Sequence, residues 1–515
     1  MLNDFWSKLK SGSDIRAVAT NDIPDEELEL TNEVLEKISL AFALWLSNTF
    51  KVQCSEITVA IGHDSRISAS RIKNIFINSL RGVGISVYDC GLTSTPAMFM
   101  ATSVLDCLAS VQITASHHPF NRNGLKFFTS KGGFCESEIE EILNLAKNGD
   151  SPPITKMGSV RNINLMSYYC EKLLSVIKDG IGAKKSDLNE NILKGFKIVV
   201  DAGNGAGGFF VEKILNVLGA NTTGSRYLEP DGMFPNHVPN PEDPKAMESI
   251  VDAVKESGAD LGIIFDTDVD RVAFVGKSGK EISKNKLIAL ASTIALKDKK
   301  DGVIVTDSVT SGYLKKFIEN LGGSQFRYKR GYQNVISMAK KLGEKGVYCP
   351  LAIESSGHAA FKENDFVDDG AYFAAKIIVE MVKARAQNKN LEDLISNLID
   401  AQESVSFRIK AEAELSDKIL NDFKNFVQSN KMLDLDKDNI EGVRAESNIK
   451  HQKGWILLRK SIHDPVLIVY AESYVSGGLK SIIGTVCSFL KKYKSLDFAE
   501  IENFLNKNKN HSHLQ

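Results

Sequence analysis

Short apolar runs alternate with helix-like segments through the first 400 residues of the chain, and this alternation limits the folds it can adopt. The run EITVAIGHDSR (56–66) ends in a polar loop, and ASRIKNIFINSLRGVG (69–84) follows with apolar residues at helical spacing. The same unit recurs at 196–219, 259–297 and 302–323. Strand–loop–helix repeats of this kind predict parallel strands covered by helices. In such folds the loops that leave the carboxyl ends of the strands carry the functional site.

The repeats form three similar modules, which start near residues 1, 190 and 300. After about residue 405 the pattern changes to strand-like runs with helices before and after them, namely SVSFRIKAE (404–412), GWILLRKSI (454–462) and PVLIVYAES (465–473). We predict an α/β fold of three similar modules with mixed or parallel sheets and a smaller C-terminal α+β domain. The expected domain boundaries are 1–185, 186–299, 300–402 and 403–515.

Bulk composition excludes several classes of protein. A net charge of -2 over 515 residues gives no general attraction to nucleic acid or anionic lipid. The cysteines are scattered and contain no C-x-x-C pair, which argues against a disulfide framework. The start of the chain does not resemble a secretory signal, and no apolar run approaches the roughly 20 residues of a membrane span. We expect a cytoplasmic monomer or homodimer that acts on a small molecule, without a nucleic-acid or membrane partner.

The stretch VQITASHHPFNRNGLKF (111–127) is the first candidate site loop. Ser116 follows an apolar strand, where its hydroxyl can face a cleft, and His117 stands beside it as a potential base. Lys126 can pair with a phosphate or move a proton. The competing interpretation is a turn with a solvated serine and a structural histidine.

The stretch LGIIFDTDVDR (261–271) is the second candidate loop. Its acids Asp266, Asp268 and Asp270 alternate after a buried strand, so in an extended loop they face one way. Carboxylates that converge are costly unless a cation neutralises them, and oxygen-only ligands favour Mg²⁺. Arg271 is placed to hold a phosphate oxygen. An acidic surface turn is the alternative, but apolar strands flank the triplet on both sides.

Two further loops offer polar groups between apolar flanks, and an ordinary turn is the alternative in both. The loop 352–361 carries acceptors of the kind that sugar hydroxyls need, and the loop 454–470 carries cations and hydroxyls that can grip a phosphate. The candidate substrate-binding residues are Lys329, Glu354, Ser356, His358, Arg459, Lys460, Ser461 and His463.

The run DAGNGAGG has glycines 203, 205 and 208 at the G-x-G-x-x-G spacing of a dinucleotide site. A second nucleotide-binding half is not evident, and the strongest polar loops lie elsewhere. We interpret these glycines as tight packing at a strand–helix turn.

In order and spacing, these loops resemble those of the α-D-phosphohexomutase family. TASHHP (114–119) is similar to the family's phosphoserine loop T-A-S-H-N-P, and DTDVDR (266–271) to its metal loop D-G-D-x-D-R. ESSGH (354–358) is similar to its sugar-binding loop, and RKSIHDP (459–465) stands in the place of its phosphate-binding loop R-x-S-G-T-E-P. GSDIRA (12–17) resembles its N-terminal segment, which brings Arg16 near the site.

The resemblance implies four domains around a central cleft and a phosphohexomutase reaction. A phosphoserine gives its phosphoryl group to a hexose phosphate, and the bisphosphate intermediate returns the other one. The family match implies that the sugar is glucose, mannose or both, that one Mg²⁺ binds per chain, and that a hexose bisphosphate acts as activator. By the same match, the catalytic residues are Ser116, His117, Lys126, Arg271 and Arg16, and the metal ligands are Ser116, Asp266, Asp268 and Asp270.

Departures from the family pattern keep other functions open. His118 and Thr267 replace Asn and Gly, and the fourth loop has Ile462-His463-Asp464 in place of Gly-Thr-Glu. A phosphoglucosamine mutase is one alternative, and a divergent sugar-phosphate-binding relative with weak or no mutase activity is another. A third is a D-x-D phosphatase that uses Asp266 as its nucleophile; this reading leaves the serine loop unexplained.

Overall fold

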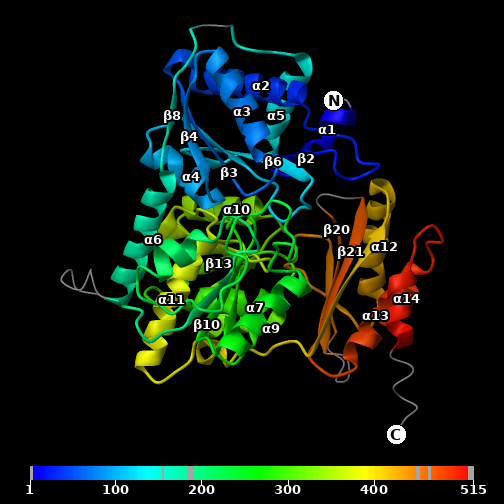
Figure 1. Cartoon of the computed structure of the whole chain (residues 1–515). Coiled ribbons are helices and arrows are strands. Elements are labelled where there is room, and N and C mark those ends of the chain that lie inside the picture. The colour runs from blue at the N-terminus through cyan, green and yellow to red at the C-terminus, as the bar shows by residue number, and fades with distance from the viewer. Residues whose placement is uncertain (1–3, 154–155, 183–190, 448–452, 462–464, 508–515) are drawn as a thin grey trace. The chain divides into compact units, whose positions relative to one another are not determined.

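The computed structural model describes residues 4–153, 156–182, 191–447, 453–461 and 465–507 (Figure 1). The chain divides into two compact units, which are described one at a time below. Unit 1 comprises Met1–Ile294 and Ser356–Ser396, and unit 2 comprises Ala295–Ser355 and Asn397–Gln515.

The N-terminal part of unit 1 is built on a mixed sheet with the strand order β1-β2-β6-β5-β3-β4-β8. Strand β3 lies between β4 and β5 and is parallel to both, whereas β6 is antiparallel to β5 and β2. The strands are β1 (Lys10–Ser11), β2 (Asp14–Val18), β3 (Thr58–His63), β4 (Ser86–Leu92), β5 (Ala109–Ile113), β6 (Arg122–Thr129), β7 (Gly132–Gly133) and β8 (Val160–Asn162).

Helices cover both faces of this sheet (Figure 1). On β5, Val111 and Ile113 face the apolar core that α2, α3 and α5 complete, whereas Ser110 and Gln112 bond to the segment around α4. The strand is therefore buried on both sides, which explains its nearly continuous apolar sequence. The helical segments are α1 (Asp4–Lys8), α2 (Asn32–Phe50), η1 (Cys54–Glu56), α3 (Ala69–Gly82), α4 (Thr95–Val104), α5 (Glu136–Asn148) and α6 (Leu165–Ile181).

A second sheet in unit 1 has the order β12-β11-β10-β9. Strands β9 and β10 are parallel, and β10 and β11 form an antiparallel hairpin in which Phe265 pairs with Val272. The remaining elements of unit 1 are β9 (Ile198–Asp201), the π-helical segment η3 (Phe210–Leu215), α7 (Pro244–Ser257), β10 (Leu261–Phe265), β11 (Val272–Gly276), β12 (Glu281–Ile282), α8 (Lys284–Ala295), β16 (Ala359–Phe361), η4 (Lys362–Asn364), α11 (Gly370–Ala386) and η5 (Leu391–Ile395).

The glycine-rich turn after β9 packs against the β10–β11 connection, as the packing interpretation of the sequence predicts. A Cβ atom on Gly205 would lie 2.6 Å from the carbonyl oxygen of Thr267, and one on Gly208 would lie 2.2 Å from that of Leu228. The Ala206 amide donates to the Thr267 carbonyl oxygen at 2.8 Å. These glycines let two backbones meet, which confirms that packing accounts for their spacing.

Unit 2 contains two sheets of different type. Strand β13 lies between β14 and β15 and is parallel to both, with α9 and α10 packed against them. The other sheet is antiparallel, in the order β17-β21-β20-β19-β18, and α12 and α13 cover its apolar face. The elements are β13 (Val303–Thr306), α9 (Gly312–Asn320), β14 (Ser324–Arg327), α10 (Tyr332–Glu344), β15 (Leu351–Ile353), β17 (Glu403–Lys410), α12 (Ala413–Ser429), β18 (Asp434–Leu435), β19 (Val443–Ser447), β20 (Gly454–Lys460), β21 (Val466–Ser473), α13 (Gly478–Leu490) and α14 (Ala499–Lys507).

The fold class predicted from the sequence is confirmed: mixed α/β sheets precede a C-terminal α+β region. The three strand-like runs after residue 403 correspond to β17, β20 and β21, but the pattern missed β18 and β19. The helix expected over 209–219 is a short π-helical segment followed by turns. Within the described ranges, every helix is too short or too polar to traverse a bilayer.

Candidate active site

Ser116 lies in the turn that follows β5, in unit 1, and only 2% of its surface is exposed. Its φ angle is 49°, in the left-handed region that residues other than glycine rarely occupy. The Ser116 amide donates to the Thr114 hydroxyl at 2.9 Å, which helps to hold this conformation. A buried polar residue with a strained backbone is typical of a functional site.

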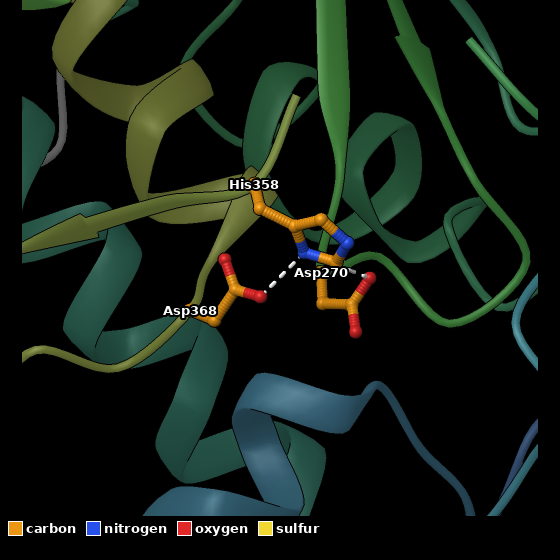
Figure 2. Close-up of side chains that lie close together, drawn as sticks. All are labelled: Asp270, His358 and Asp368. Atoms are coloured by element: carbon orange, nitrogen blue, oxygen red, sulfur yellow. Dashed lines mark hydrogen bonds and ion pairs between the residues drawn. The ribbon is translucent and has the colours of Figure 1, made fainter. Parts of the chain in front are cut away.

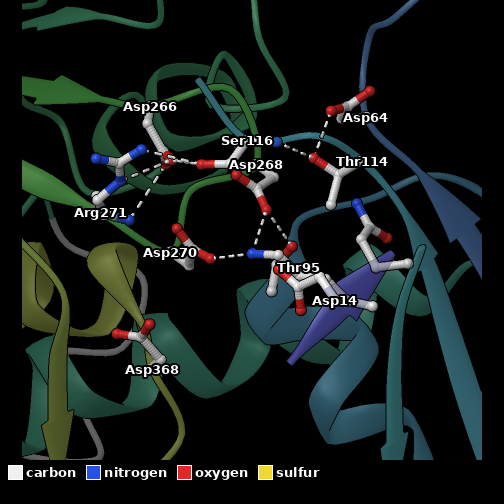
Figure 3. A network of polar contacts seen from close by, with 12 residues as sticks. Asp14, Asp64, Thr95, Thr114, Ser116, Asp266, Asp268, Asp270, Arg271 and Asp368 are labelled. Atoms are coloured by element: carbon white, nitrogen blue, oxygen red, sulfur yellow. Dashed lines mark hydrogen bonds and ion pairs between the residues drawn. The ribbon is translucent and has the colours of Figure 1, made fainter. Parts of the chain in front are cut away.

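The Ser116 hydroxyl joins two parts of unit 1 that are distant in the sequence (Figure 3). It donates to Oδ2 of Asp266 at 2.9 Å and accepts from Nη2 of Arg271 at 3.0 Å. Nδ1 of His117 lies 3.3 Å from the same oxygen. The loop after β5 and the β10–β11 connection therefore form one site.

The acids Asp266, Asp268 and Asp270 are fully buried, and one carboxylate oxygen from each lies within 4.8 Å of the others. Their convergence agrees with the sequence prediction, but the predicted cause was wrong. The segment is a tight turn, with Val269 at a φ of 67°, rather than an extended loop. Thr267 keeps a φ outside the left-handed region, so the missing family glycine leaves this turn intact.

The pKa values of Asp266 and Asp270 are shifted in opposite directions. Burial, and then the negative charges of Asp270 and Asp268, raise the pKa of Asp266 well above its usual range. Burial alone would also raise the pKa of Asp270, but the positive charges of Lys126, His358 and Arg271 hold it below its usual value. A divalent cation bound by these carboxylates would relieve their mutual repulsion and favour the ionised form of Asp266.

Lys126 projects from β6 into the acid cluster and is 1% exposed. Its Nζ donates to Oδ2 of Asp268 at 3.0 Å and to Oδ2 of Asp270 at 2.5 Å. The lysine that sequence analysis selected is therefore in contact with the predicted metal ligands.

The acid cluster has the chemistry of a hard-cation site. Oδ1 of Asp268 and Oδ1 of Asp270 are buried and have no hydrogen-bond partner among the residues that the structure describes. All of the grouped donors are carboxylate oxygens, and magnesium or calcium prefers such ligands. The residues present could therefore bind a divalent metal.

His117 and Arg271 form a contact between Nδ1 of the imidazole and Nη2 of the guanidinium. Because arginine only donates, Nδ1 is the acceptor, and the ring proton is on Nε2. Burial, and then the positive charges of Arg271 and Arg16, lower the pKa of His117 well below its usual value. His117 is neutral at pH 7. Arg16 itself is held by Asp14 at 2.7 Å, on β2.

His358 lies beside the acid cluster, within unit 1, between Asp368 and Asp270 (Figure 2). Its Nδ1 lies 2.5 Å from Oδ2 of Asp368 and 3.8 Å from Oδ1 of Asp270. Burial would lower the pKa of His358, but Asp368 and Asp270 raise it to about 9. A protonated imidazole is a poor metal ligand, so the three aspartates are the better candidate ligand set.

The other residues of the ESSGH loop fall on both sides of the unit boundary. Ser356 is buried and belongs to unit 1, whereas Glu354 belongs to unit 2 and accepts from the Gly331 amide at 2.6 Å. In unit 2, Ser355 donates to Oδ2 of Asp307 at 2.7 Å. Burial, and then the charge of Glu354, raise the pKa of Asp307 to about 7.

The RKSIHDP loop is only partly described. Arg459 is 3% exposed and lies 3.6 Å from the Glu441 carboxylate, whereas its neighbour Lys460 is exposed and donates to Asp417 at 2.6 Å. The side chains of Arg459 and Lys460 alternate on a strand, so they face opposite ways.

The Ser461 amide donates to the Val466 carbonyl oxygen at 2.9 Å. His463 lies outside the described residues.

Sequence analysis missed several residues at these sites. Thr95, at the start of α4, donates to Oδ2 of Asp268 at 2.5 Å, and Asp368 pairs with His358.

In unit 2, Arg330 donates to the Tyr470 hydroxyl at 3.0 Å, next to Arg459. The exposed Lys329, which was predicted to bind substrate, is the neighbour of Arg330 in the sequence. The partners in these contacts are distant in the sequence, so no local motif predicts them.

Comparison with known proteins relates the chain to a family. The family described as "Phosphoglucomutase/phosphomannomutase, alpha/beta/alpha domain I" matches residues 8–152, and its domains II and III match 169–279 and 283–401. A phosphomannomutase/phosphoglucomutase from Pseudomonas syringae pv. tomato is 30% identical over 468 residues, which cover 90% of this chain and 94% of that protein. A probable phosphoglucosamine mutase from Methanopyrus kandleri is 28% identical, with 81% of this chain and 86% of that protein covered.

A solved structure has the same fold. The phosphoglucomutase/phosphomannomutase family protein from Burkholderia thailandensis superposes with a TM-score of 0.77 at 24% identity, over 96% of this chain and 99% of that one. A buried serine hydroxyl beside an arginine and a set of acids is an arrangement suited to phosphoryl transfer. The chain belongs to the phosphoglucomutase/phosphomannomutase family, the α-D-phosphohexomutases, whose members are mutase isomerases.

Proposed function

We propose that the chain interconverts hexose 1-phosphate and hexose 6-phosphate, with glucose, mannose or both as the sugar. The observation that carries the proposal is the 2.9 Å hydrogen bond from the Ser116 hydroxyl to Asp266, which joins a nucleophile to the acid cluster. Family membership supports the reaction type, and the names of the relatives support the choice of sugars.

In this mechanism Ser116 carries a phosphoryl group between turnovers. The bond from phosphorus to the serine oxygen breaks as a bond to the free hydroxyl of the sugar phosphate forms, and that hydroxyl loses its proton. The resulting hexose bisphosphate turns over in the site. Its other phosphoryl group returns to Ser116, and the sugar oxygen that is released takes up a proton.

Arg271 and His117 flank the transferring group. Arg271 already donates to the Ser116 oxygen at 3.0 Å, so its fixed positive charge faces the oxygen that gains charge as the phosphoryl group leaves. His117 is neutral, and its Nε2 proton is available as a further donor. Arg16 adds positive charge on the same side, as its effect on the His117 pKa indicates.

Lys126 is the proposed acid–base group for the sugar hydroxyl. Its Nζ donates to Asp268 and Asp270, and we assign to it the protonation of the sugar oxygen that leaves. The return reaction requires the same group to accept the proton.

We propose that one Mg²⁺ binds per chain to Asp266, Asp268, Asp270 and a phosphoserine oxygen on Ser116. A divalent cation there supplies neutralising charge for the phosphoryl group. The Oδ1 atoms of Asp268 and Asp270, which accept no hydrogen bond from the described residues, support this ligand set. A hexose bisphosphate serves as activator because it rephosphorylates a serine that has lost its group to water.

The proposed substrate-binding residues differ in how much the structure says about them. Glu354, Ser356 and His358 are assigned to the sugar hydroxyls, and Arg459 and Ser461 to the phosphate that does not transfer. The ion pair with Asp417 argues against a large role for Lys460. Lys329 and His463 remain candidates on sequence grounds alone.

The test is a turnover assay with glucose, mannose and glucosamine monophosphates, given Mg²⁺ and the corresponding bisphosphate. Wild-type protein should convert at least one hexose phosphate, and Ser116→Ala should lose at least about 10³-fold in kcat because the phosphoenzyme no longer forms. Ser137→Ala, an exposed serine, is the control. No turnover of any of these sugars would overturn the proposal.

Three alternatives have their own predicted results. Turnover of glucosamine phosphate alone would favour a phosphoglucosamine mutase, which the relative from Methanopyrus kandleri supports. Exchangeable phosphate on Ser116 without turnover would favour the divergent sugar-phosphate-binding protein. A D-x-D phosphatase would keep its activity in Ser116→Ala, because Asp266 and not Ser116 would be its nucleophile.

We also propose properties of the chain as a whole. Its domain boundaries lie at 185/186, 299/300 and 402/403, and it is a monomer or a homodimer. The cytoplasmic location is also a proposal, which the free cysteines support because reducing compartments keep thiols unpaired.

A further inference from the structure

Arg66, on the turn after β3, is a buried cation that hydrogen-bonds to the serine loop, although no motif assigns it a role. Its Nη1 donates to the carbonyl oxygens of Pro119 and Arg122, at 2.7 Å each. Its Nη2 donates to the carbonyl oxygen of His118 at 2.6 Å and to that of Ser116. One guanidinium thus binds carbonyl groups along the whole loop from 116 to 122.

The surroundings of Arg66 fix its orientation. Nε lies 3.4 Å from Oδ2 of Asp64, and neither side chain is exposed. The Arg66 amide donates to Oδ1 of the same carboxylate at 2.9 Å. On another side, the guanidinium carbon lies 5.2 Å from the centre of the Phe234 ring. Arg66 is therefore a rigid part of unit 1 that the loop folds around.

A second chain of hydrogen bonds leads from the same carboxylate to the amide of the serine (Figure 3). The Thr114 hydroxyl donates to Oδ2 of Asp64 at 2.6 Å and accepts from the Ser116 amide at 2.9 Å. Asp64 and Arg66 thus hold both the N–H and the C=O of Ser116. These are the groups whose directions define its left-handed backbone conformation, with φ at 49°.

We propose that Arg66, braced by Asp64, is the positioning residue that holds Ser116 in this conformation and so aims its hydroxyl at Asp266. Arg66 acts through the backbone of the loop and not on the reacting atoms, because its guanidinium donates to carbonyl oxygens and pairs with Asp64. The inference rests on the proposed function, since it assigns a cause to the geometry of the phosphate-carrying serine.

Lysine cannot replace arginine in this role. A guanidinium presents five N–H groups in a planar fork, whereas an ammonium group is a point charge at the end of a flexible stem. Arg66→Lys keeps the charge opposite Asp64 but leaves several loop carbonyls without their donor. The variant therefore separates the geometry of the fork from its charge.

The experiment compares Arg66→Lys with Arg71→Lys in the full-length protein. Arg71, on α3, also donates to backbone carbonyls, those of Ala19 and Leu30, at 2.9 and 3.0 Å, but not to the serine loop. Arg66→Lys should lower kcat by about 10²-fold, since a displacement of about 1 Å has that effect, while KM and Mg²⁺ affinity stay within about threefold. Arg71→Lys should keep kcat within about twofold of wild type.

Phosphate incorporation at Ser116, followed by intact mass after mixing with the bisphosphate, should slow by the same factor as kcat in Arg66→Lys. Thr114→Val removes the support of the Ser116 amide without a change in charge, and it should lower kcat by about tenfold with KM unchanged. It also serves as the test if Arg66→Lys does not fold, which circular dichroism would reveal.

Full kcat in Thr114→Val, or in a folded Arg66→Lys, would overturn the positioning role, as would a loss that falls on KM. These failures differ from failure of the proposed function. In that case wild-type protein itself would not convert any hexose phosphate.

Discussion

Nζ of Lys126 donates hydrogen bonds to Oδ2 of Asp270 at 2.5 Å and to Oδ2 of Asp268 at 3.0 Å. The lysine comes from β6 and the acids from the β10–β11 turn. The same two acids carry the Oδ1 atoms that accept no hydrogen bond from the described residues and that could bind a divalent cation. Lys126 and a bound metal would therefore interact with the same two carboxylates, and the positive charge of each should weaken the interaction of the other.

Replacement of Lys126 by Met should accordingly strengthen Mg²⁺ binding by about tenfold, because the positive charge that competes for the acids is removed. Turnover should fall by about 10²–10⁴-fold, since the proposed proton donor is lost. Isothermal titration calorimetry and the mutase assay measure the two effects. Lys131→Met, at an exposed position beyond the end of β6, is the control. Weaker or unchanged Mg²⁺ binding in Lys126→Met would contradict the competition.

Mg²⁺ should raise the thermal midpoint of the wild-type protein, because a ligand that binds only the folded state stabilises it by about 2.7 kcal/mol at a hundred times Kd. Asp268→Asn should lose most of this shift, since it removes one charged ligand of the cluster. Differential scanning fluorimetry with EDTA or Mg²⁺ gives the comparison. The exposed Asp179→Asn should respond as wild type does. Equal shifts in both variants would exclude Asp268 as a ligand.

Gly205→Ala should disturb the turn that carries Asp266 and Asp268, because Gly205 packs against Thr267 in that turn. Its Cβ atom would lie 2.6 Å from the Thr267 carbonyl oxygen, which is closer than a real Cβ contact. We expect a lower thermal midpoint and weaker Mg²⁺ binding, by calorimetry. Gly484→Ala, on α13 with no atom within 4 Å of the added Cβ, should be neutral or stabilise by about 0.5–1 kcal/mol. If both variants behaved alike, the close packing at Gly205 would not matter.

Asp307 should give unit 2 a pH-dependent stability. Burial, and then Glu354, raise its pKa from 3.8 to about 7, so the folded state keeps a proton that the unfolded state releases. A raised folded-state pKa stabilises fully below about pH 4, and the contribution is lost as the pH rises through about 7. Asp307→Asn stays neutral and can still accept from Ser355.

The stability of Asp307→Asn relative to wild type should therefore rise between about pH 4 and 7, by on the order of a few kcal/mol, and then level off. Thermal midpoints of both proteins from pH 5 to 8 provide the measurement. Midpoints that run parallel across this range would show that Asp307 does not titrate there.

The residues that the structure brings together around Ser116 could largely be selected from local sequence. Ser116, the acids at 266, 268 and 270, and Lys126 follow apolar strands or lie on them, so periodicity and residue type were enough to select them. The path of the acid turn was not predictable, because Val269 adopts a left-handed conformation that β-branched residues rarely accept. Tertiary contacts impose that conformation, for example the amide of Gly370 donating to the Val269 carbonyl oxygen at 3.1 Å.

Residues that act through distant partners were missed for the same reason. Arg66 lies 50 positions before Ser116, and Thr95 lies 173 positions before Asp268. Neither stands in a pattern that a single sequence distinguishes from an ordinary turn or helix start. Their relevance follows from the pairing of strands and loops, which composition and spacing do not encode.

The three acids arrive together on one short turn between paired strands, while the serine comes from another sheet. Most of the proposed metal ligands are therefore neighbours in the chain, and only one comes from the nucleophile's loop. Damage to that loop, by mutation or by proteolytic cleavage near His118, should thus abolish phosphoryl transfer and yet leave three carboxylates that can bind a divalent cation.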